Sequence, residues 1–295
     1  MKKPIILLAL LCSCLVFSCK INTGKELKGT TGEIFQKPKG TLFIIGGGKR
    51  PPEMIKELIE VSNMENGAYA VILPMSSSEQ DSAVFYAAKQ FTELGVPAEK
   101  IKGFNFTKEQ QDPARLDSLK KANLIYISGG DQSTFMDIVL NSPAHKAIKE
   151  AYYNGATIAG TSAGAAVMSK KMITGNEYKH PVYTGDFATI EADNIELKEG
   201  LGLLENAIID QHFIQRMRMN RLLSTAIENP GEISIGIDES TALLVQNDSA
   251  KVVGNAQVIL IENRNGSKRS KNGLLGADDL KVSVKLPGEI FLLKQ

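Results

Sequence analysis

The chain has 295 residues, 43% of them hydrophobic, so it is long enough to bury one sizeable α/β core or two small ones. Its formal net charge is +1, tryptophan is absent and aromatic residues make up 6%, which argues against nucleic-acid and carbohydrate binding. The three cysteines are Cys12, Cys14 and Cys19. The rest of the chain therefore has no internal disulfide, cysteine nucleophile or thiolate metal site.

The N-terminal segment has the pattern of a bacterial lipoprotein signal peptide. Two lysines precede an apolar stretch, residues 5–17, that is short for a bilayer span and ends in a serine followed by Cys19. We expect residues 1–19 to be the signal, Cys19 to be lipidated and the polar residues 20–39 to be a tether. An ordinary secretory signal with incidental cysteines is the alternative. The predicted location is the cell envelope, with the exported protein held at the bacterial outer membrane through its lipid alone.

From residue 40 onward, short apolar strands alternate with helices, which predicts a parallel sheet covered on both faces. The expected strands are 41–45, 68–73, 100–104, 124–127 and 156–159, and the expected helices are 52–62, 79–94, 109–122 and a broken stretch up to 154. Four strand ends are rich in glycine or serine, namely 46–48, 76–78, 129–132 and 160–164. Because ligands collect at the carboxyl ends of parallel strands, these four segments are expected to meet on one edge of the sheet.

The second half of the chain has a different pattern. Residues 170–200 lack helical periodicity and indicate hairpins or a long excursion. A strand is expected at 203–209, a helix at 213–227 and several short strands from 233 onward. No internal repeat or linker interrupts this order, so residues 40–295 are predicted to form one α/β domain with a mostly parallel central sheet and a β-rich C-terminal extension.

The segment 160–164 reads Gly-Thr-Ser-Ala-Gly, between an apolar strand and a helical start of small residues. This is the order of a nucleophile elbow, in which a sharp turn presents the serine hydroxyl to a pocket. Ser162 is therefore a candidate nucleophile, although a tight glycine-containing turn without catalysis would have the same pattern. The N–H of Ala163 and that of Gly130 on a neighbouring strand end are candidate donors to an oxyanion.

A serine nucleophile needs a general base, and the chain has three histidines. His212 directly follows a predicted strand and is the preferred candidate, His180 lies in the irregular excursion, and His145 is expected at the surface. The acid that would orient the histidine stays open at this point. Spacing alone does not choose among the four acidic residues between the serine and the histidine, which are Glu177, Asp186, Glu191 and Asp193.

Three arginines, Arg216, Arg218 and Arg221, follow His212 in the predicted helix. Arginine forks bind carboxylates, so these side chains favour an acidic substrate, although a solvated cationic face would look the same. The scattered histidines show no recognisable ligand spacing, and we expect neither a metal nor another cofactor.

Taken together, these motifs resemble cyanophycinases and their relatives in serine peptidase family S51 over nearly all of residues 40–262. The matching segments are GGDQ at 129–132, GTSAGA at 160–165, DQHF at 210–213 followed by the three arginines, and GIDE at 236–239. The resemblance implies a flavodoxin-like three-layer sandwich of the class I glutamine amidotransferase type, with Ser162 as nucleophile and His212 as base. It also implies Glu177 as the triad acid.

The same resemblance implies a substrate pocket and a substrate class. Gln132, Asp210, Gln211 and the three arginines would line the pocket, and the substrate would be an acidic peptide or a β-aspartyl-arginine polymer. The lipoprotein-like leader departs from enzymes that degrade an internal polymer and favours external polymer or isoaspartyl peptides. An α-aspartyl dipeptidase and a catalytically silent binding lipoprotein are the alternatives. A homodimer is compatible with this prediction.

Overall fold

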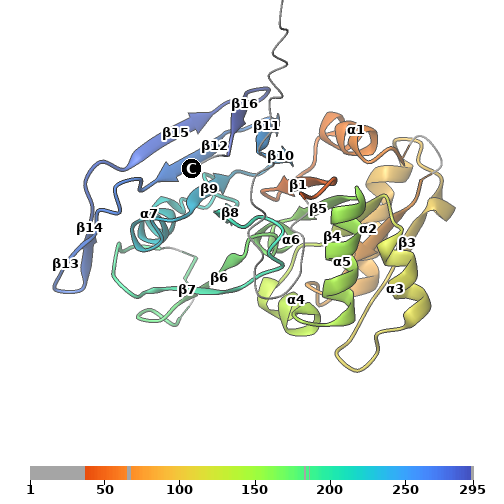
Figure 1. Ribbon diagram of the computed structural model, residues 1–295, viewed down its shortest axis with the longest axis horizontal. Helices are drawn as coiled ribbons and strands as arrows, with labels where there is room; N and C mark the ends of the chain where they lie inside the picture. Colours follow the sequence, from red (N-terminus) through yellow and green to blue (C-terminus); the bar gives the residue numbers. More distant parts are fainter. Residues whose placement is uncertain (1–36, 65–67, 183, 186, 294–295) are drawn as a thin grey trace, which may run out of the picture. The chain divides into compact units, whose positions relative to one another are not determined.

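The computed structural model describes residues 37–293 except 65–67, 183 and 186, and these residues belong to one compact unit that begins at Lys37. The predicted leader, which ends at Cys19, and most of the predicted tether lie outside the described residues. An eight-stranded sheet in the order β16-β11-β10-β1-β5-β4-β2-β3 forms the centre of the unit (Figure 1). Its parallel strands are β1 (Thr41–Ile45), β2 (Ala70–Leu73), β3 (Ile101–Gly103), β4 (Leu124–Ile127) and β5 (Thr157–Thr161). Its antiparallel strands are β10 (Thr241–Gln246), β11 (Ser249–Gly254) and β16 (Ile290–Leu292).

Helices cover both faces of the parallel part, as continuous apolar strands require. The helices α1 (Pro52–Val61) and α2 (Gln80–Thr92) pack on one face. The helices α3 (Pro113–Lys120), α4 (Gln132–Val139) and α5 (Pro143–Asn154) pack on the other. A side-chain oxygen caps the start of each of these last three helices. Asp112 accepts a hydrogen bond from the N–H of Arg115, Asp131 accepts one from the N–H of Thr134, and Ser142 accepts one from the N–H of His145. These caps end the preceding loops and fix where each helix starts.

The strand order agrees only in part with a flavodoxin-like sheet. The flavodoxin order is 2-1-3-4-5, counted along the chain. If β2 is counted as the first strand, the neighbours β3-β2-β4-β5 correspond to 2-1-3-4. The fifth place is held by β1, the first strand of the domain, so it is not filled by a strand that follows β5. The central sheet is thus mostly parallel. Beyond β1 it continues with antiparallel strands of the C-terminal region, because β10 pairs with β1.

A second sheet in the order β15-β12-β9-β8 packs against the first through a shared apolar core. It contains β8 (Ala207–Gln211), β9 (Ile233–Ile237), β12 (Val258–Glu262) and β15 (Lys281–Lys285), and α7 (Met219–Glu228) covers its outer face. Two hairpins complete the fold: β6 (Lys171–Glu177) with β7 (Ile195–Glu199), and β13 (Arg269–Lys271) with β14 (Leu274–Gly276). The irregular 170–200 excursion is therefore built around a β-hairpin.

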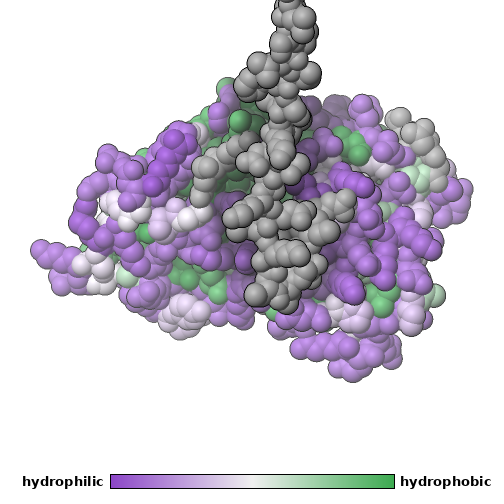
Figure 2. All heavy atoms as spheres, in the orientation of Figure 1, coloured by the Kyte–Doolittle hydropathy of each residue, from purple (hydrophilic) through white to green (hydrophobic). Residues whose placement is uncertain are grey.

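The helix expected at 213–227 begins six residues later, at Met219. Residues 213–218 form turns instead, and Met217 has a positive φ of 49° that a continuous helix excludes. Within the described part of the chain, no helix is both long and apolar enough to cross a membrane. The face in Figure 2 is largely hydrophilic where it is coloured.

Candidate active site

Ser162 lies in the sharp turn between β5 and the single-turn helix α6 (Ala163–Ala166). Its backbone has φ 54° and ψ −112°, a strained conformation for a residue other than glycine, which costs about 1–3 kcal/mol. A side chain at Gly160 would overlap the carbonyl of Gly164, and one at Gly164 would overlap that of Ile127. The GxSxG pattern therefore has a steric cause, and this turn has the geometry of a nucleophile elbow.

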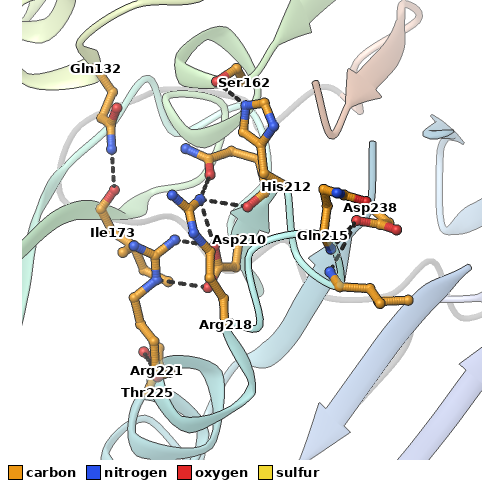
Figure 3. A network of polar contacts seen from close by, with 12 residues as sticks. Gln132, Ser162, Ile173, Asp210, His212, Gln215, Arg218, Arg221, Thr225 and Asp238 are labelled. Carbon is orange, nitrogen blue, oxygen red and sulfur yellow. Dashed lines mark hydrogen bonds and ion pairs between the residues drawn. The ribbon is translucent and has the colours of Figure 1, made fainter. Parts of the chain in front are cut away.

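His212 follows β8 and points its ring at the serine (Figure 3). Its Nε2 lies 2.8 Å from Ser162 Oγ, and its Nδ1 lies 2.6 Å from Glu239 Oε1. His212 is 7% exposed. These three side chains form a continuous Ser-His-Glu hydrogen-bond chain, the arrangement that activates a serine hydroxyl.

The prediction that Glu177 orients the histidine is wrong in this geometry. Glu177 ends β6 and accepts a hydrogen bond from Asn194 Nδ2 at 2.7 Å, while Glu239 occupies the position beside His212. The four candidate acids lie between the serine and the histidine in the sequence, whereas Glu239 comes after both. The sequence signal was that Glu239 closes the GIDE segment, 236–239, directly after an apolar run. The pairing of Gln211 with Ile237, which brings the ends of β8 and β9 together, is seen only in the structure.

The other candidates have different partners. His180 pairs with Glu191 at 2.9 Å, so neither of these side chains contacts Ser162 or His212. Asp186 lies outside the described residues. His145 is buried, contrary to the surface position expected, because its ring bridges the N–H of Asn141 and the carbonyl of Leu201.

The glycine-rich and serine-rich strand ends meet around Ser162 as the parallel order predicts. A side chain on Gly129 would lie 3.4 Å from Ser162 Cβ. The next residue, Gly130, has φ +140° and packs so tightly against the carbonyl of Ser76 that a Cβ would overlap it. Ser76 also donates from Oγ to the carbonyl of Ser128 at 2.8 Å and accepts from the N–H of Asp131 at 2.8 Å. The loop that carries Gly130 is thus held from both sides.

The oxyanion donors stay a prediction. Neither the N–H of Gly130 nor that of Ala163 donates a hydrogen bond to another described residue. Ala163 directly follows Ser162, and Gly130 directly follows Gly129, which packs beside the Ser162 side chain. They are the candidate donors to a developing oxyanion.

The Gly46–Gly48 turn makes room for the catalytic histidine and its acid. A Cβ on Gly47, which has φ +113°, would overlap the His212 ring, and one on Gly48 would lie 2.6 Å from Glu239 Oε2. The carbonyl of Gly46 accepts from the N–H of His212 at 2.8 Å. Glycine is needed here because only hydrogen atoms fit between the backbone and the imidazole.

Two of the three predicted substrate arginines are buried in an internal network (Figure 3). Arg221 donates from Nε to Asp210 Oδ2 at 2.9 Å, donates from Nη2 to Asp210 Oδ1, and stacks on the Phe187 ring at 4.3 Å. Arg218 lies 3.7 Å from the same carboxylate and donates to the carbonyl and the side-chain oxygen of Gln211. Asp210 thus neutralises much of the charge of both guanidinium groups. The expectation that Arg218 and Arg221 are available to bind a substrate carboxylate is therefore wrong.

Arg216 differs from its two neighbours because it is exposed on the turn after His212. The expected helix would have placed it one turn above His212, but the turn geometry leaves its side chain at the surface. Gln132 is buried at the start of α4, where its Nε2 donates to the carbonyls of Ile173 at 3.0 Å and Thr174 at 2.6 Å. It therefore joins the start of α4 to β6.

Burial lowers the pKa of His212 below its ordinary value of 6.5, and the positive charges of Arg216 and Arg218 lower it further. The hydrogen bond and negative charge of Glu239 oppose this shift. The net direction keeps the imidazole neutral near pH 7, which is the form that accepts a proton from serine. Within the described residues, no cluster of three or more His, Asp or Glu side chains is arranged to hold a metal ion.

We expect the acid limb of kcat/KM to have its midpoint below pH 6.5, because a lowered pKa leaves His212 unprotonated until the solution is more acidic. Replacing Arg216 with Gln removes one charge that disfavours the imidazolium, so the limb should move to higher pH. The shift should be small because Arg216 is solvated. Initial rates from pH 4 to 9 measure the acid limb of the wild type and of the variant. A wild-type midpoint above pH 6.5 would contradict the lowered pKa of His212.

The fold and the site define a serine hydrolase with a mixed α/β fold, in which a histidine and a glutamate that follow neighbouring strands activate the serine. The chain belongs to peptidase family S51, whose model matches residues 42–253. A cyanophycinase from Nostoc sp. is 29% identical over 288 residues, covering 93% of both chains. A cyanophycinase from Geminocystis herdmanii is 27% identical over 248 residues, covering 82% of this chain and 87% of the relative.

Solved structures show the same fold. A peptidase from an acI-B1 actinobacterium superposes with a TM-score of 0.63 at 23% identity, covering 87% of this chain and 98% of that one. A putative peptidase E protein from Listeria monocytogenes gives a TM-score of 0.51 at 16% identity, covering 74% and 99%. At these identities the likeness concerns the fold alone.

Proposed function

We propose that this protein is a serine exopeptidase that hydrolyses β-aspartyl linkages, in a β-aspartyl-arginine polymer or in isoaspartyl peptides. The observation that carries the proposal is the intact Ser162-His212-Glu239 chain in a family member whose relatives include cyanophycinases. The three arginines do not by themselves choose a substrate, because Asp210 already holds Arg218 and Arg221.

In this proposal, Ser162 Oγ attacks the scissile carbonyl carbon while His212 Nε2 takes its proton. The N–H groups of Gly130 and Ala163 stabilise the oxyanion. The C–N bond then breaks and His212 gives the proton to the leaving amine, which leaves the acyl group on Ser162. In the second half, His212 takes a proton from water, the water oxygen attacks the acyl carbonyl, and the proton returns to Ser162 Oγ as it leaves. Glu239 keeps the imidazole tautomer that presents Nε2 to the serine and stabilises the imidazolium.

The buried network has a defined place in this proposal. Asp210 and the two arginines hold Gln211 and the start of α7, with Phe187 covering Arg221. An acidic substrate could exchange for part of this network only by competing with Asp210. Arg216 is exposed without that competition and is the arginine proposed to meet a substrate carboxylate first.

The test is product analysis with the purified chain on matched α- and β-aspartyl peptides and on cyanophycin. Release of β-Asp-Arg supports the proposal, and cleavage of α-aspartyl dipeptides alone would favour the dipeptidase alternative. Arg216→Gln should raise KM for peptides with an extra carboxylate more than for their neutral amides. Tight binding of acidic peptides without turnover would favour the silent binding protein.

We also propose that the protein is exported and anchored in the cell envelope through a lipid on Cys19. The support is the order of lysines, apolar residues and a serine-cysteine pair at the N-terminus. Cys19→Ser should move the protein from the membrane fraction to the soluble exported fraction. An unchanged distribution would contradict the anchor. The homodimer stays a prediction that sedimentation velocity can test.

A further inference from the structure

We propose that Asp238 is a positioning residue that holds His212 in place between Ser162 and Glu239. The inference concerns the site of the proposed serine peptidase and rests on that role. Asp238 does not contact the serine or the imidazole; its carboxylate binds the backbone that follows the histidine (Figure 3).

The carboxylate of Asp238 closes the turn after His212. Its Oδ1 accepts hydrogen bonds from the N–H of Ile214 at 3.0 Å and from the N–H of Gln215 at 2.9 Å. Asp238 is 8% exposed, so water competes little for these bonds. One oxygen therefore satisfies two consecutive donors that have no helical partner at this position.

The contact belongs to a series made by four consecutive residues, the last two of β9 and the two that follow it. The Phe213 ring packs on Gly236, where a Cβ would overlap it, and the N–H of Phe213 donates to the carbonyl of Ile237 at 3.3 Å. Asp238 then takes the next two N–H groups, and Glu239 binds the imidazole. The segment 236–239 thus holds the backbone of 213–215 and the His212 side chain together.

His212 needs such support because its backbone is in the left-handed region, with φ 51°. This conformation is unfavourable for a residue with a side chain and persists only where the surroundings hold it. The N–H of His212 is fixed on the Gly46 carbonyl, and the chain beyond it is fixed by Asp238. With the second anchor removed, the turn can relax and the ring can leave the line between serine and glutamate.

The experiment compares Asp238→Ala with Asp238→Asn in the full chain. Asparagine keeps an Oδ1 acceptor in the same place, whereas alanine leaves both N–H groups without it. Asp238→Ala should lower kcat by about 100-fold, the scale expected for a small misplacement of a catalytic group, with little change in KM. Asp238→Asn should retain most of the activity.

Two readouts do not depend on the substrate. The first is the rate at which a fluorophosphonate probe labels Ser162, which should fall in Asp238→Ala and be largely preserved in Asp238→Asn. The second is the low-field proton resonance of His212 Nδ1–H in its hydrogen bond with Glu239, which should broaden or vanish in the alanine variant only. Both are measured well below the melting temperature of each variant.

Asn263→Ala is the matched control for a purely structural effect. Asn263 is also buried, and its side chain closes a turn by accepting from the N–H of Ser267 at 3.0 Å, away from the catalytic residues. It should lose stability but keep the wild-type labelling rate and resonance. The proposal is overturned if Asp238→Ala labels like the wild type, if Asn263→Ala shows the same loss, or if Asp238→Asn is as impaired as alanine. A wild-type chain that is not labelled at all would refute the peptidase assignment instead, and the resonance would then decide the role of Asp238 alone.

Discussion

Ser162→Ala is expected to lower kcat by a factor of about 10⁶, because the variant has no oxygen to form the acyl-enzyme and loss of a triad serine has effects of this size. KM for a cleaved peptide should change little, since the arginines and the backbone donors remain in place. The measurement is steady-state turnover with enough enzyme to detect the residual rate, alongside labelling by the fluorophosphonate probe.

Ser82→Ala is the matched control for this experiment. Ser82 is exposed on α2 and is not part of the hydrogen-bond network around His212. It should keep wild-type turnover and labelling. Turnover of Ser162→Ala within tenfold of the wild type would show that another group carries out the reaction.

Glu239→Gln is expected to lower kcat by about 10⁴, the effect measured when a triad acid is replaced by its amide elsewhere. The amide can offer an N–H to His212 Nδ1, which favours the tautomer that presents a proton, not a lone pair, to Ser162. The 2.6 Å contact between Glu239 and His212 makes this residue sensitive to that change.

Glu177→Gln provides the contrast that separates the two candidate acids. The Glu177 carboxylate binds Asn194, so its amide should retain nearly full kcat. Equal losses in both variants, or a larger loss at Glu177, would contradict the geometry. The ratio of the two kcat values is therefore a direct measurement of which carboxylate orients the histidine.

Local patterns were sufficient for the nucleophile and the base. The glycines at 160 and 164 and the apolar strand before them are local requirements of the turn that holds Ser162. His212 is predictable because it directly follows an expected strand, and the structure places its Nε2 2.8 Å from Ser162 Oγ. Both residues can therefore be predicted from the residues next to them in the sequence.

The acid and the direction of the arginines depend on long-range contacts. Glu239 reaches His212 only because β8 and β9 are neighbours in the second sheet, a pairing that spacing does not reveal. The helix start was displaced because Asp238, from a later segment, closes the turn at 214–215. With that displacement, Arg218 and Arg221 point inward to Asp210, and only Arg216 stays exposed.

The catalytic residues come from two different sheets, and this makes activity a late event in the life of the chain. Ser162 follows a strand of the eight-stranded sheet, whereas His212 and Glu239 follow neighbouring strands of the four-stranded one. A nascent chain that ends at α7 contains the serine and the histidine but neither Glu239 nor the Asp238 anchor. The proton-transfer machinery of the peptidase is therefore complete only once β9 and the segment 238–239 have been made and β9 has paired with β8.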